Sequence, residues 1–283
     1  MKTYLIADSG STKADWALVN ENGERLMQLS TPGITVAISS EEALSDSIKQ
    51  VVENCNNNPD DIFFYGAGCI GDLSLRICSI LKSFYPDSSI SVNSDMLGAA
   101  RALFGYKKGI ACILGTGSNS CVYDGNDIVS QIPSLGYILG DEGSGATFGK
   151  ILLNRIFKKR LGNDIINAFF EEYNLSVEEV IRKVYREEPP NRFLASLVPF
   201  IAKNLNRPEI NEMVIDEFMR FFKNNVMQYV DYKKYEIGFI GSIAFFMKDQ
   251  LETAAHSCGL PISQILHKPI DQLINFHVVG NRI

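Results

Sequence analysis

Two glycine-rich turns carry the residues of this sequence that are best suited to chemistry. The apolar run Ile110–Leu114 ends at Gly115-Thr116-Gly117-Ser118-Asn119, and a second run, Cys121–Tyr123, stops at the turn signal Asp124-Gly125. A strand, a glycine turn and a strand allow backbone N–H groups to close on a phosphate, because glycine has no Cβ to block the approach. Such a turn also occurs as a purely structural hairpin, so this segment alone leaves both interpretations open.

The N-terminus repeats the same plan. Tyr4–Ala7 and Ala14–Val19 are apolar runs that flank DSGSTK at positions 8–13, and Asn22-Gly23 makes a hairpin turn into a third run. An offset of 107 residues matches Gly10 with Gly117 and Ser11 with Ser118. Self-similarity at a fixed offset suggests a duplicated unit, so two such hairpins are expected to hold a polyphosphate.

The polar side chains of the first turn suit a nucleotide phosphate site. Asp8 can hold Mg²⁺ through water, while Ser11, Thr12 and Lys13 can donate to phosphate oxygens. The alternative is that Asp8 is only a turn residue before Gly10.

Three further positions place acidic or hydroxyl side chains at turns or at junctions between a strand and a helix. Asp141 and Glu142 lie between glycines, where short acidic side chains can reach a hydroxyl or a metal. Asp95 follows a short strand and opens a helix, which is where open α/β folds place working residues, although the local sequence by itself favours a helix N-cap. Gly241-Ser242 joins a strand to a helix, and this junction fits either a nucleotide's base or ribose or simple close packing.

These residues require an α/β framework with a helical addition. Strands and helices alternate up to a boundary near Tyr106–Gly109, which predicts a mixed sheet with helices on its faces. The strands expected there are 4–7, 14–19, 24–29, 62–67 and 90–93, and the helices are 41–55, 73–84 and 96–104. Beyond Gly149 helical spacing covers 150–161, 163–173, 176–185, 192–204 and 208–229, followed by a strand over 236–241 and helices over 243–258 and 267–275.

Composition narrows the function classes. The chain has 283 residues, of which 46% are hydrophobic and 21% charged, and a net charge of -6. We expect no nucleic-acid partner, because no basic run of sufficient density is present, and no membrane span, because no apolar stretch reaches about 18 residues. The apolar start is too short for a secretory signal, which predicts a cytoplasmic protein. The six cysteines show neither a CxxC pair nor zinc spacing with the three histidines, and Cys69, Cys78, Cys112 and Cys121 are expected in the core.

Three motifs together resemble the BadF/BadG/BcrA/BcrD-type ATPase family, and within it the N-acetylglucosamine kinase-like branch. They are DSGSTK at 8–13, LGTGSNS at 114–120 and LGYILGDEGSG at 135–145, supported by GFIGSIA at 238–244 and the HKPIDQLI tail. The resemblance implies a two-domain actin-like ATPase fold of the actin/hexokinase/Hsp70 superfamily, built from duplicated ribonuclease H-like domains. The expected domains are residues 1–106 and 107–283, with a helical insertion at about 150–230 in the second and a last helix able to pack back on the first.

The resemblance also implies a role for each matched position. Asp95 corresponds to the catalytic base. The positions that correspond to ATP and phosphate binding are Asp8, Gly10, Ser11, Thr12, Lys13, Gly115, Thr116, Gly117, Gly241 and Ser242, and the metal position is Asp8. Those that correspond to sugar binding are Thr35, Asp95, Ser118, Asn119, Gly136 and Asp141.

Two departures from the family pattern touch the sugar site. Thr35 stands where the family carries a sugar-binding Asn, and Leu135 stands where a bulky aromatic residue is common, with Tyr137 next to it. The identity of the acceptor sugar is therefore less well defined by the sequence than the use of ATP.

The expected activity is ATP- and Mg²⁺-dependent phosphorylation of an amino sugar, with N-acetylglucosamine at its 6-position as the acceptor. The expected partner is thus a small-molecule sugar, and the helical insertion would suit the interface of a homodimer. Two alternatives remain open: an ATPase that energises a partner protein, like the dehydratase activators of this family, and a sugar-sensing protein without turnover. The first would need bridging cysteines for an iron–sulfur cluster, and the second would normally carry a DNA-reading helix pair.

Overall fold

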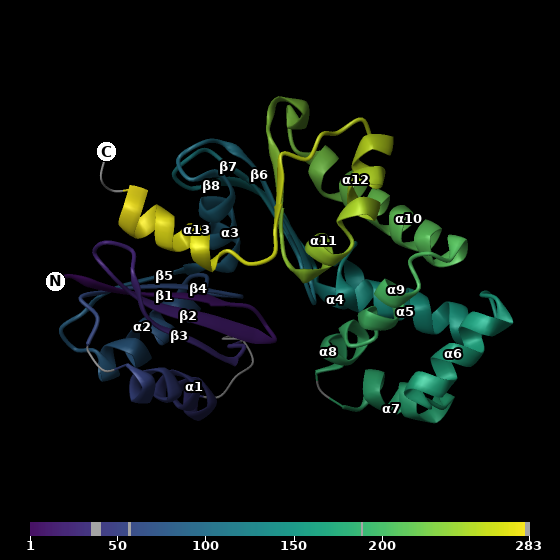
Figure 1. Cartoon of the computed structure of the whole chain (residues 1–283), viewed down its shortest axis with the longest axis horizontal. Helices are drawn as coiled ribbons and strands as arrows, with labels where there is room; N and C mark the ends of the chain where they lie inside the picture. The colour runs from purple at the N-terminus through teal and green to yellow at the C-terminus, as the bar shows by residue number, and fades with distance from the viewer. Residues whose placement is uncertain (35–40, 56–57, 188, 281–283) are drawn as a thin grey trace. The chain divides into compact units, whose positions relative to one another are not determined.

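The structure, a computed structural model, describes residues 1–34, 41–55, 58–187 and 189–280. The chain forms two compact units (Figure 1). Unit 1 consists of residues 1–111, 123–129 and 268–283, and unit 2 consists of residues 112–122 and 130–267. The chain therefore passes from one unit to the other four times, and its last segment returns to the unit in which it began. The division expected at 106/107 stays a prediction.

Unit 1 is built on a five-stranded sheet in the order β3-β2-β1-β4-β5. Its strands are β1 (Thr3–Ser9), β2 (Lys13–Asn20), β3 (Arg25–Pro32), β4 (Asp61–Gly66) and β5 (Ser89–Ser94). β1, β2 and β3 pair antiparallel, whereas β4 lies parallel to β1 and β5 parallel to β4. The mixed sheet predicted from the alternation of elements is therefore present.

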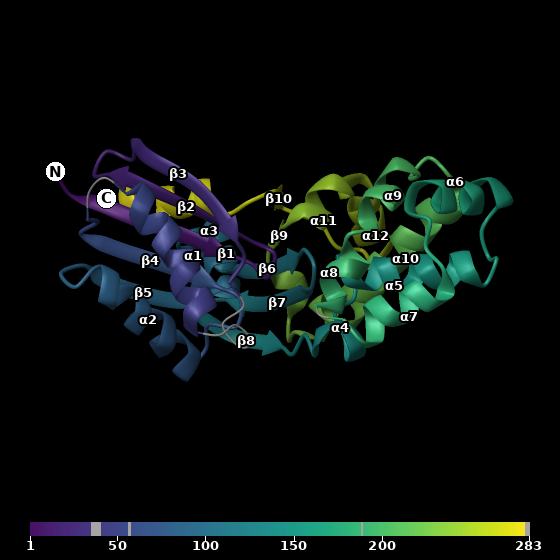
Figure 2. The same ribbon diagram turned by 90° about the horizontal axis from the view of Figure 1, so that it is seen from below.

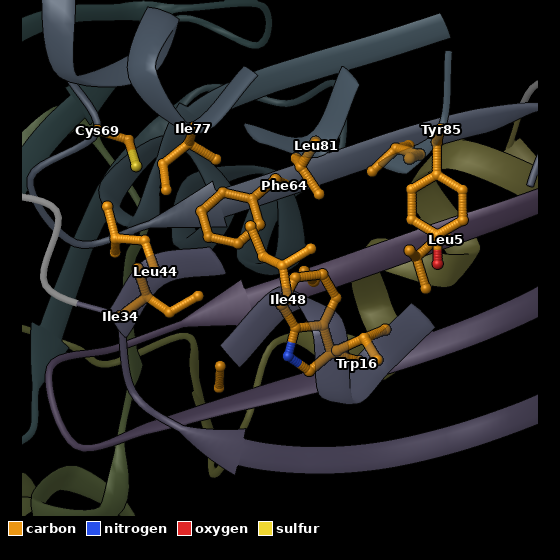
Figure 3. Close-up of a cluster of buried hydrophobic side chains, with 14 of the residues drawn as sticks. Leu5, Trp16, Ile34, Leu44, Ile48, Phe64, Cys69, Ile77, Leu81 and Tyr85 are labelled. Carbon is orange, nitrogen blue, oxygen red and sulfur yellow. The ribbon is translucent and has the colours of Figure 1, made fainter. Parts of the chain in front are cut away.

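Helices cover both faces of this sheet (Figure 2). One face carries α1 (Glu41–Asn54) and α2 (Asp72–Phe84), and the other carries α3 (Asp95–Phe104) and α13 (Ile270–Ile274). α1 buries Leu44, Ile48 and Val51, whose spacing of four and three residues places them on one helix face. They join Trp16 and Phe64 of the sheet in a single apolar core (Figure 3).

The second sheet has the order β10-β9-β6-β7-β8. Its strands are β6 (Gly109–Leu114), β7 (Ser118–Tyr123), β8 (Ile128–Ile132), β9 (Ile237–Ile240) and β10 (Gln264–Leu266). Read from its other edge, this order is β8-β7-β6-β9-β10, which matches β3-β2-β1-β4-β5 of the first sheet position by position. This common strand order supports the predicted duplication of one unit.

The two glycine-rich turns correspond to each other with a different offset in the structure than in the sequence match. The turns between β1 and β2 and between β6 and β7 comprise residues 10–12 and 115–117. Their positions differ by 105 rather than 107 residues, so Gly10 corresponds to Gly115, and Ser118 begins β7 instead of lying in the turn. The sequence match aligned the two Gly-Ser pairs, whereas the strand ends define the turns.

A long helical segment connects β8 to β9. At the corresponding place in the first sheet, the single helix α1 connects β3 to β4. It contains α4 (Gly136–Leu139), α5 (Gly145–Phe157), α6 (Asn163–Tyr173), α7 (Val177–Tyr185), α8 (Pro190–Ala195), α9 (Val198–Lys203) and α10 (Pro208–Asn224), followed by short 3₁₀ turns η1 (Val226–Gln228) and η2 (Tyr232–Lys234). The segment begins before residue 150, because Ser144 caps α5 by accepting the N–H of Thr147.

Three predicted helices differ from the structure. The helix expected over 192–204 is split into α8 and α9, because Pro199 lacks an N–H and can only occupy the first turn of a helix. The helix expected over 243–258 is two helices, α11 (Ser242–Phe246) and α12 (Lys248–Ser257), separated at Met247. The last helix starts at Ile270 and continues as a π-helix, η3 (Asn275–Val279). No helix in the described ranges combines the length and the apolar character needed to cross a bilayer.

Candidate active site

The first phosphate turn, residues 10–12, is closed by a neighbouring glycine. The N–H of Gly10 donates to the carbonyl of Lys13 at 3.0 Å, and the N–H of Gly33 donates to the carbonyl of Thr12 at 3.0 Å. A Cβ on Gly33 would lie 2.3 Å from the carbonyl oxygen of Gly10, so only glycine allows the chain after β3 to pack on this turn. Gly10, Ser11, Thr12 and Lys13 are thus held together as the sequence predicted. Thr35, two residues beyond Gly33, lies outside the described residues.

Two carboxylates lie side by side on the face of the first sheet that α3 and α13 cover. Asp8 of β1 is paired with Asp15 of β2 across the antiparallel register, which directs both side chains to the same face. Burial raises the pKa of Asp8 to about 7, with further contributions from the charges of Asp95 and Asp15, while Lys268 acts in the opposite direction. Asp8 is therefore a strand residue among acidic neighbours, and not a simple turn residue.

Asp95 is the first residue of α3, but it does not cap the helix. Ser94 is the N-cap, since its hydroxyl accepts the N–H of Leu97 at 3.2 Å, so the N-cap interpretation of Asp95 is wrong. The Asp95 carboxylate accepts the N–H of Met96 at 2.9 Å. Burial raises the pKa of Asp95 to about 6, against the opposing effect of that hydrogen bond. This value suits a general base near neutral pH, a role that stays a prediction.

Asp15 and Lys268 are two site residues that the sequence analysis missed. The Asp15 side chain forms ion pairs with Lys13 at 3.2 Å and with Lys268 at 2.7 Å, and it accepts the hydroxyl of Ser30 at 2.5 Å. Burial raises the pKa of Asp15, yet the hydrogen bonds from Lys268, Ser30 and Lys13 bring it below its ordinary value. The available signal was an acidic residue inside the apolar run of β2.

The second phosphate turn, residues 115–117, is braced by the start of α5. The carbonyls of Gly115 and Thr116 accept the N–H groups of Gly145 and Ala146 at 2.8 and 3.0 Å. Asp141 reaches the other side of the turn, where its Oδ1 accepts the N–H of Ser118 at 3.2 Å. The structure thus brings Asp141 together with Gly115, Thr116, Gly117 and Ser118.

The position of Asp141 favours a glycine at residue 117. A Cβ on Gly117 would lie 3.0 Å from Oδ2 of Asp141, so a larger residue would displace the carboxylate. Asp141 itself has a φ of 56°, a left-handed conformation that is uncommon outside glycine but tolerated by aspartate. Burial raises the pKa of Asp141, while the Ser118 N–H and the charge of Lys150 lower it.

Helix α10 holds the acidic box, defined here as residues 140–143, in place. Glu217 is only 2% exposed and accepts the N–H of Gly143 at 3.1 Å, and it pairs with Arg220 at 2.8 Å. Glu142 accepts the side-chain amide of Asn224 at 2.9 Å. The sequence analysis missed Glu217, because a glutamate in an amphipathic helix gives no sign of burial.

The remaining predicted sugar residues lie in the same unit as the box. Asn119 is in β7, where its Oδ1 accepts the N–H of Ser120 at 2.9 Å and the side-chain amide of Gln131 at 3.0 Å. Gly136 opens α4 with a φ of 72°, and no atom lies within 4 Å of the position that its Cβ would take. Their roles toward a sugar stay predictions.

The junction at Gly241 is closely packed. Gly241 has a φ of 123°, its N–H donates to the carbonyl of Leu266 at 3.1 Å, and a Cβ there would lie 2.2 Å from the carbonyl oxygen of Leu114. Ser242 begins α11 directly after it. Close packing therefore explains this glycine, and contact of Gly241 and Ser242 with a nucleotide stays a prediction.

All six cysteines are free thiols; Cys69, Cys112 and Cys121 are buried as expected, whereas Cys78 is only half-buried. Burial raises the pKa of Cys112 well above its ordinary value, which keeps this thiol protonated. Within the described part of the chain, no group of three or more His, Cys, Asp or Glu side chains could hold a metal ion.

Comparison with known proteins now identifies the family. No model of a known protein family matches this chain. The crystal structure of a candidate N-acetylglucosamine kinase from Porphyromonas gingivalis, however, is 38% identical, covers 99% of this chain and 100% of its own, and superposes with a TM-score of 0.91. The chain belongs to the N-acetylglucosamine kinase-like family.

Two more distant proteins are also similar to this chain. A candidate N-acetylglucosamine kinase from Chromobacterium violaceum covers 98% of this chain and 99% of its own at 15% identity, with a TM-score of 0.72, which shows the fold alone. The glucosamine kinase GspK of Vibrio cholerae is 22% identical over 191 residues, which is 64% of this chain and 65% of that protein, slightly under two thirds of its length. This chain thus has the two-domain, actin-like α/β fold with a helical insertion that the sequence predicted.

Proposed function

We propose that this protein is an ATP-dependent kinase that phosphorylates a hydroxyl of an amino sugar, with the 6-hydroxyl of N-acetylglucosamine as the acceptor. The observation that carries this proposal is the full-length similarity, at 38% identity, to the candidate N-acetylglucosamine kinase of Porphyromonas gingivalis. The glucosamine kinase of Vibrio cholerae supports the same substrate class, because glucosamine differs from N-acetylglucosamine only by the acetyl group. Because ATP is the proposed donor, the proposal places the protein in the cytoplasm.

The proposed reaction uses the two turns and Asp95. Phosphoryl transfer asks mainly for positioning and charge neutralisation, and we propose that the turns at residues 10–12 and 115–117 contribute to both at the phosphates. Asp95 would accept the proton of the sugar hydroxyl as its oxygen attacks the terminal phosphorus, with ADP as the leaving group. Its pKa of about 6 leaves the carboxylate ionised at neutral pH.

Asp8 fits the proposed Mg²⁺ position. Burial raises the pKa of Asp8 to about 7, and the negative charges of Asp95 and Asp15 add to this effect, so a bound cation would favour the ionised carboxylate. One carboxylate with nucleotide phosphates and waters is a usual set of ligands for Mg²⁺. When bound, the ion would offset the charge that develops on the phosphate oxygens.

Asp141 is the residue that we propose for holding the sugar. Its Oδ1 is occupied by the N–H of Ser118, and its Oδ2 lies beside Gly117. A carboxylate fixed in this way is pre-organised to accept hydroxyl donors of a substrate, so little side-chain entropy is lost on binding. Asn119 and Gly136 of the same unit are proposed to complete the sugar contacts, together with Thr35.

A panel of acceptors tests the proposal. Purified protein with ATP and Mg²⁺ is offered N-acetylglucosamine, glucosamine, N-acetylmuramic acid and glucose, and ADP release is followed, with ³¹P NMR of the product to locate the new phosphate. We expect the highest kcat/KM with N-acetylglucosamine and a 6-phosphate product. ADP release without a phosphorylated sugar would instead indicate an ATPase, and sugar binding without ADP release would indicate a sensing protein.

We further propose that the protein forms a homodimer through α7. Val177, Ile181 and Tyr185 form an apolar stripe with a spacing of four residues, and they are 51%, 46% and 80% exposed. The first turn of this helix is acidic and its last turn basic, so two antiparallel copies would pair opposite charges across a two-fold axis. Analytical ultracentrifugation of the protein and of Tyr185→Asp tests this interface; a wild-type protein that stays monomeric at micromolar concentration would exclude it.

A further inference from the structure

A charged cluster on the first sheet contains more positive charge than the buried acid at its centre requires. Asp15 is 7% exposed, yet two lysines contact its carboxylate: Lys13 at Oδ1 and Lys268 at Oδ2. Ser30 adds a third donor. A single ammonium would neutralise Asp15, so the second one can act on a further negative charge, either that of Asp8, which stands opposite Asp15 in the sheet, or that of a ligand.

Both ammonium groups remain open to solvent. The side chains of Lys13 and Lys268 are 53% and 40% exposed, whereas that of Asp15 is 10% exposed. Each ammonium has three donors, and the bond to Asp15 uses one of them. The hydrogen bond to Asp15 raises the pKa of Lys268, so this residue is fully charged at neutral pH.

The cluster lies next to the first phosphate turn. Lys13 follows Thr12 directly, and Asp15 stands opposite Asp8 in the pairing of β1 with β2. Lys268 comes from the other end of the chain, at the point where the chain returns to unit 1 just before α13. Asp8 and Lys268 are close enough for each to shift the pKa of the other.

We propose that Lys268 and Lys13 form a two-lysine site for the terminal phosphates of the bound nucleotide, and that Asp15 positions both ammonium groups. This proposal rests on the proposed function, because it takes the nucleotide to be the ligand of the first turn. Asp15 acts here through the two lysines and not on the ligand itself. The return of the chain into unit 1 thereby supplies a phosphate ligand that no glycine-turn motif predicts.

The test compares nucleotides that differ only in the number of phosphates. Binding of AMP, ADP and ATP to the full-length protein is measured by calorimetry at constant Mg²⁺ for the wild type, Lys268→Met and Lys268→Arg. A lost hydrogen bond to a charged group corresponds to about a 10- to 100-fold loss of affinity. We expect Lys268→Met to lose that much for ATP and almost nothing for AMP, and Lys268→Arg to keep most of the ATP affinity.

A matched control uses the other end of the same sheet. Lys2 forms an ion pair with Asp61 at 2.6 Å, and its side chain is 51% exposed, so Lys2→Met removes a comparable pair away from the turn. Lys2→Met should bind all three nucleotides as the wild type does. If Lys268→Met does not fold, Lys268→Gln keeps a polar chain of similar length and gives the same comparison.

The possible outcomes separate this proposal from the proposed function. An equal loss for AMP and ATP, or an ATP affinity of Lys268→Met like that of Lys2→Met, would overturn the two-lysine site. Asp15→Asn should lower ATP affinity less than Lys268→Met does, because it releases the lysines without removing them. A wild-type protein that binds no ATP would contradict the proposed function itself.

Discussion

At the scale of single residues, the reactive groups are defined by their surroundings more than by their types. Asp8, Asp15 and Asp95 are three aspartates of one unit, yet the pKa is raised to about 7 in the first, lowered in the second and raised to about 6 in the third. Burial acts on all three carboxylates. At Asp15 the hydrogen bonds from Lys268, Ser30 and Lys13 outweigh burial, whereas at Asp95 the hydrogen bond from the Met96 N–H does not.

Asp95→Asn tests the proposed base. The amide keeps the size of the side chain and its ability to accept the Met96 N–H, but it cannot take a proton from the sugar. We expect kcat to fall by about 10²–10⁴-fold, with the affinity for ATP within a few-fold of the wild type. Steady-state kinetics with N-acetylglucosamine and calorimetry with ATP measure the two quantities. Wild-type turnover in this variant would rule out Asp95 as the base.

The pKa of Asp95 also predicts the pH dependence of turnover. A base works only when deprotonated, so kcat/KM for the sugar, measured at saturating Mg-ATP, should be constant above the pKa and fall about tenfold per pH unit below about 6. Asp8 titrates near the same range, but saturating Mg²⁺ should keep it ionised. The residual rate of Asp95→Asn should lack this acid limb. An unchanged limb in the variant would assign it to another group.

At the scale of elements, α10 is the support for the acidic box. Its Glu217, Asn224 and Phe221 contact Gly143 or Glu142, and the box in turn reaches the second phosphate turn through Asp141. The helical insertion thus does more than enlarge unit 2, because it fixes the geometry of the proposed sugar site.

Glu217→Ala tests this support. The change leaves the buried N–H of Gly143 without its acceptor, which typically costs about 1–3 kcal/mol of unfolding free energy. We expect a loss of this size and a raised KM for the sugar. Glu217→Gln, which retains an acceptor oxygen, should recover most of the sugar KM. Chemical denaturation and steady-state kinetics provide the two measurements, and an unaltered sugar KM in Glu217→Ala would show that α10 is only scaffold.

At the scale of the whole molecule, the end of the chain completes the unit in which the chain began. In the sequence α13 comes directly after β10, the last strand of the second sheet. In the structure, however, α13 and η3 pack on the first sheet and on α3. His277 fixes this arrangement: it stacks on Phe63 with 3.7 Å between ring centroids, and its Nε2 lies 2.7 Å from the hydroxyl of Tyr65. Arg101 of α3 donates to the same hydroxyl at 2.9 Å.

This buried histidine predicts acid-sensitive folding. Burial, with a contribution from Arg101, lowers the pKa of His277 to about 3, whereas in the unfolded chain it is 6.5. At a pH between these two values, the unfolded chain binds one more proton than the folded protein. The free energy of unfolding therefore decreases by about 1.4 kcal/mol for each unit by which the pH is lowered. His277→Gln should lack this loss. Denaturation of both proteins from pH 7 to pH 4 isolates the effect, since other groups cancel in the difference, and parallel curves would contradict it.

Much of the framework could be predicted from local patterns. Apolar runs of strand length gave β1, β2, β4, β5, β6 and β9, and helical spacing gave α1, α2, α3 and α6 closely. The sequence analysis did not predict β8 and β10, because their residues are half-buried or exposed and form no apolar run. The cap at Ser94 and the split at Pro199 depend on single residues, which periodicity does not detect.

The sequence by itself determined the two glycine turns, the duplicated α/β plan and the family, because these depend on residue types at short, fixed spacings. Only the tertiary structure decided which distant residues join them. Lys268 reaches Asp15 from 253 positions away and Glu217 reaches Gly143 from 74, and neither pair leaves a periodic trace in the chain. Ion pairs and hydrogen bonds depend on distances in space, and the packing of the sheets and helices sets those distances.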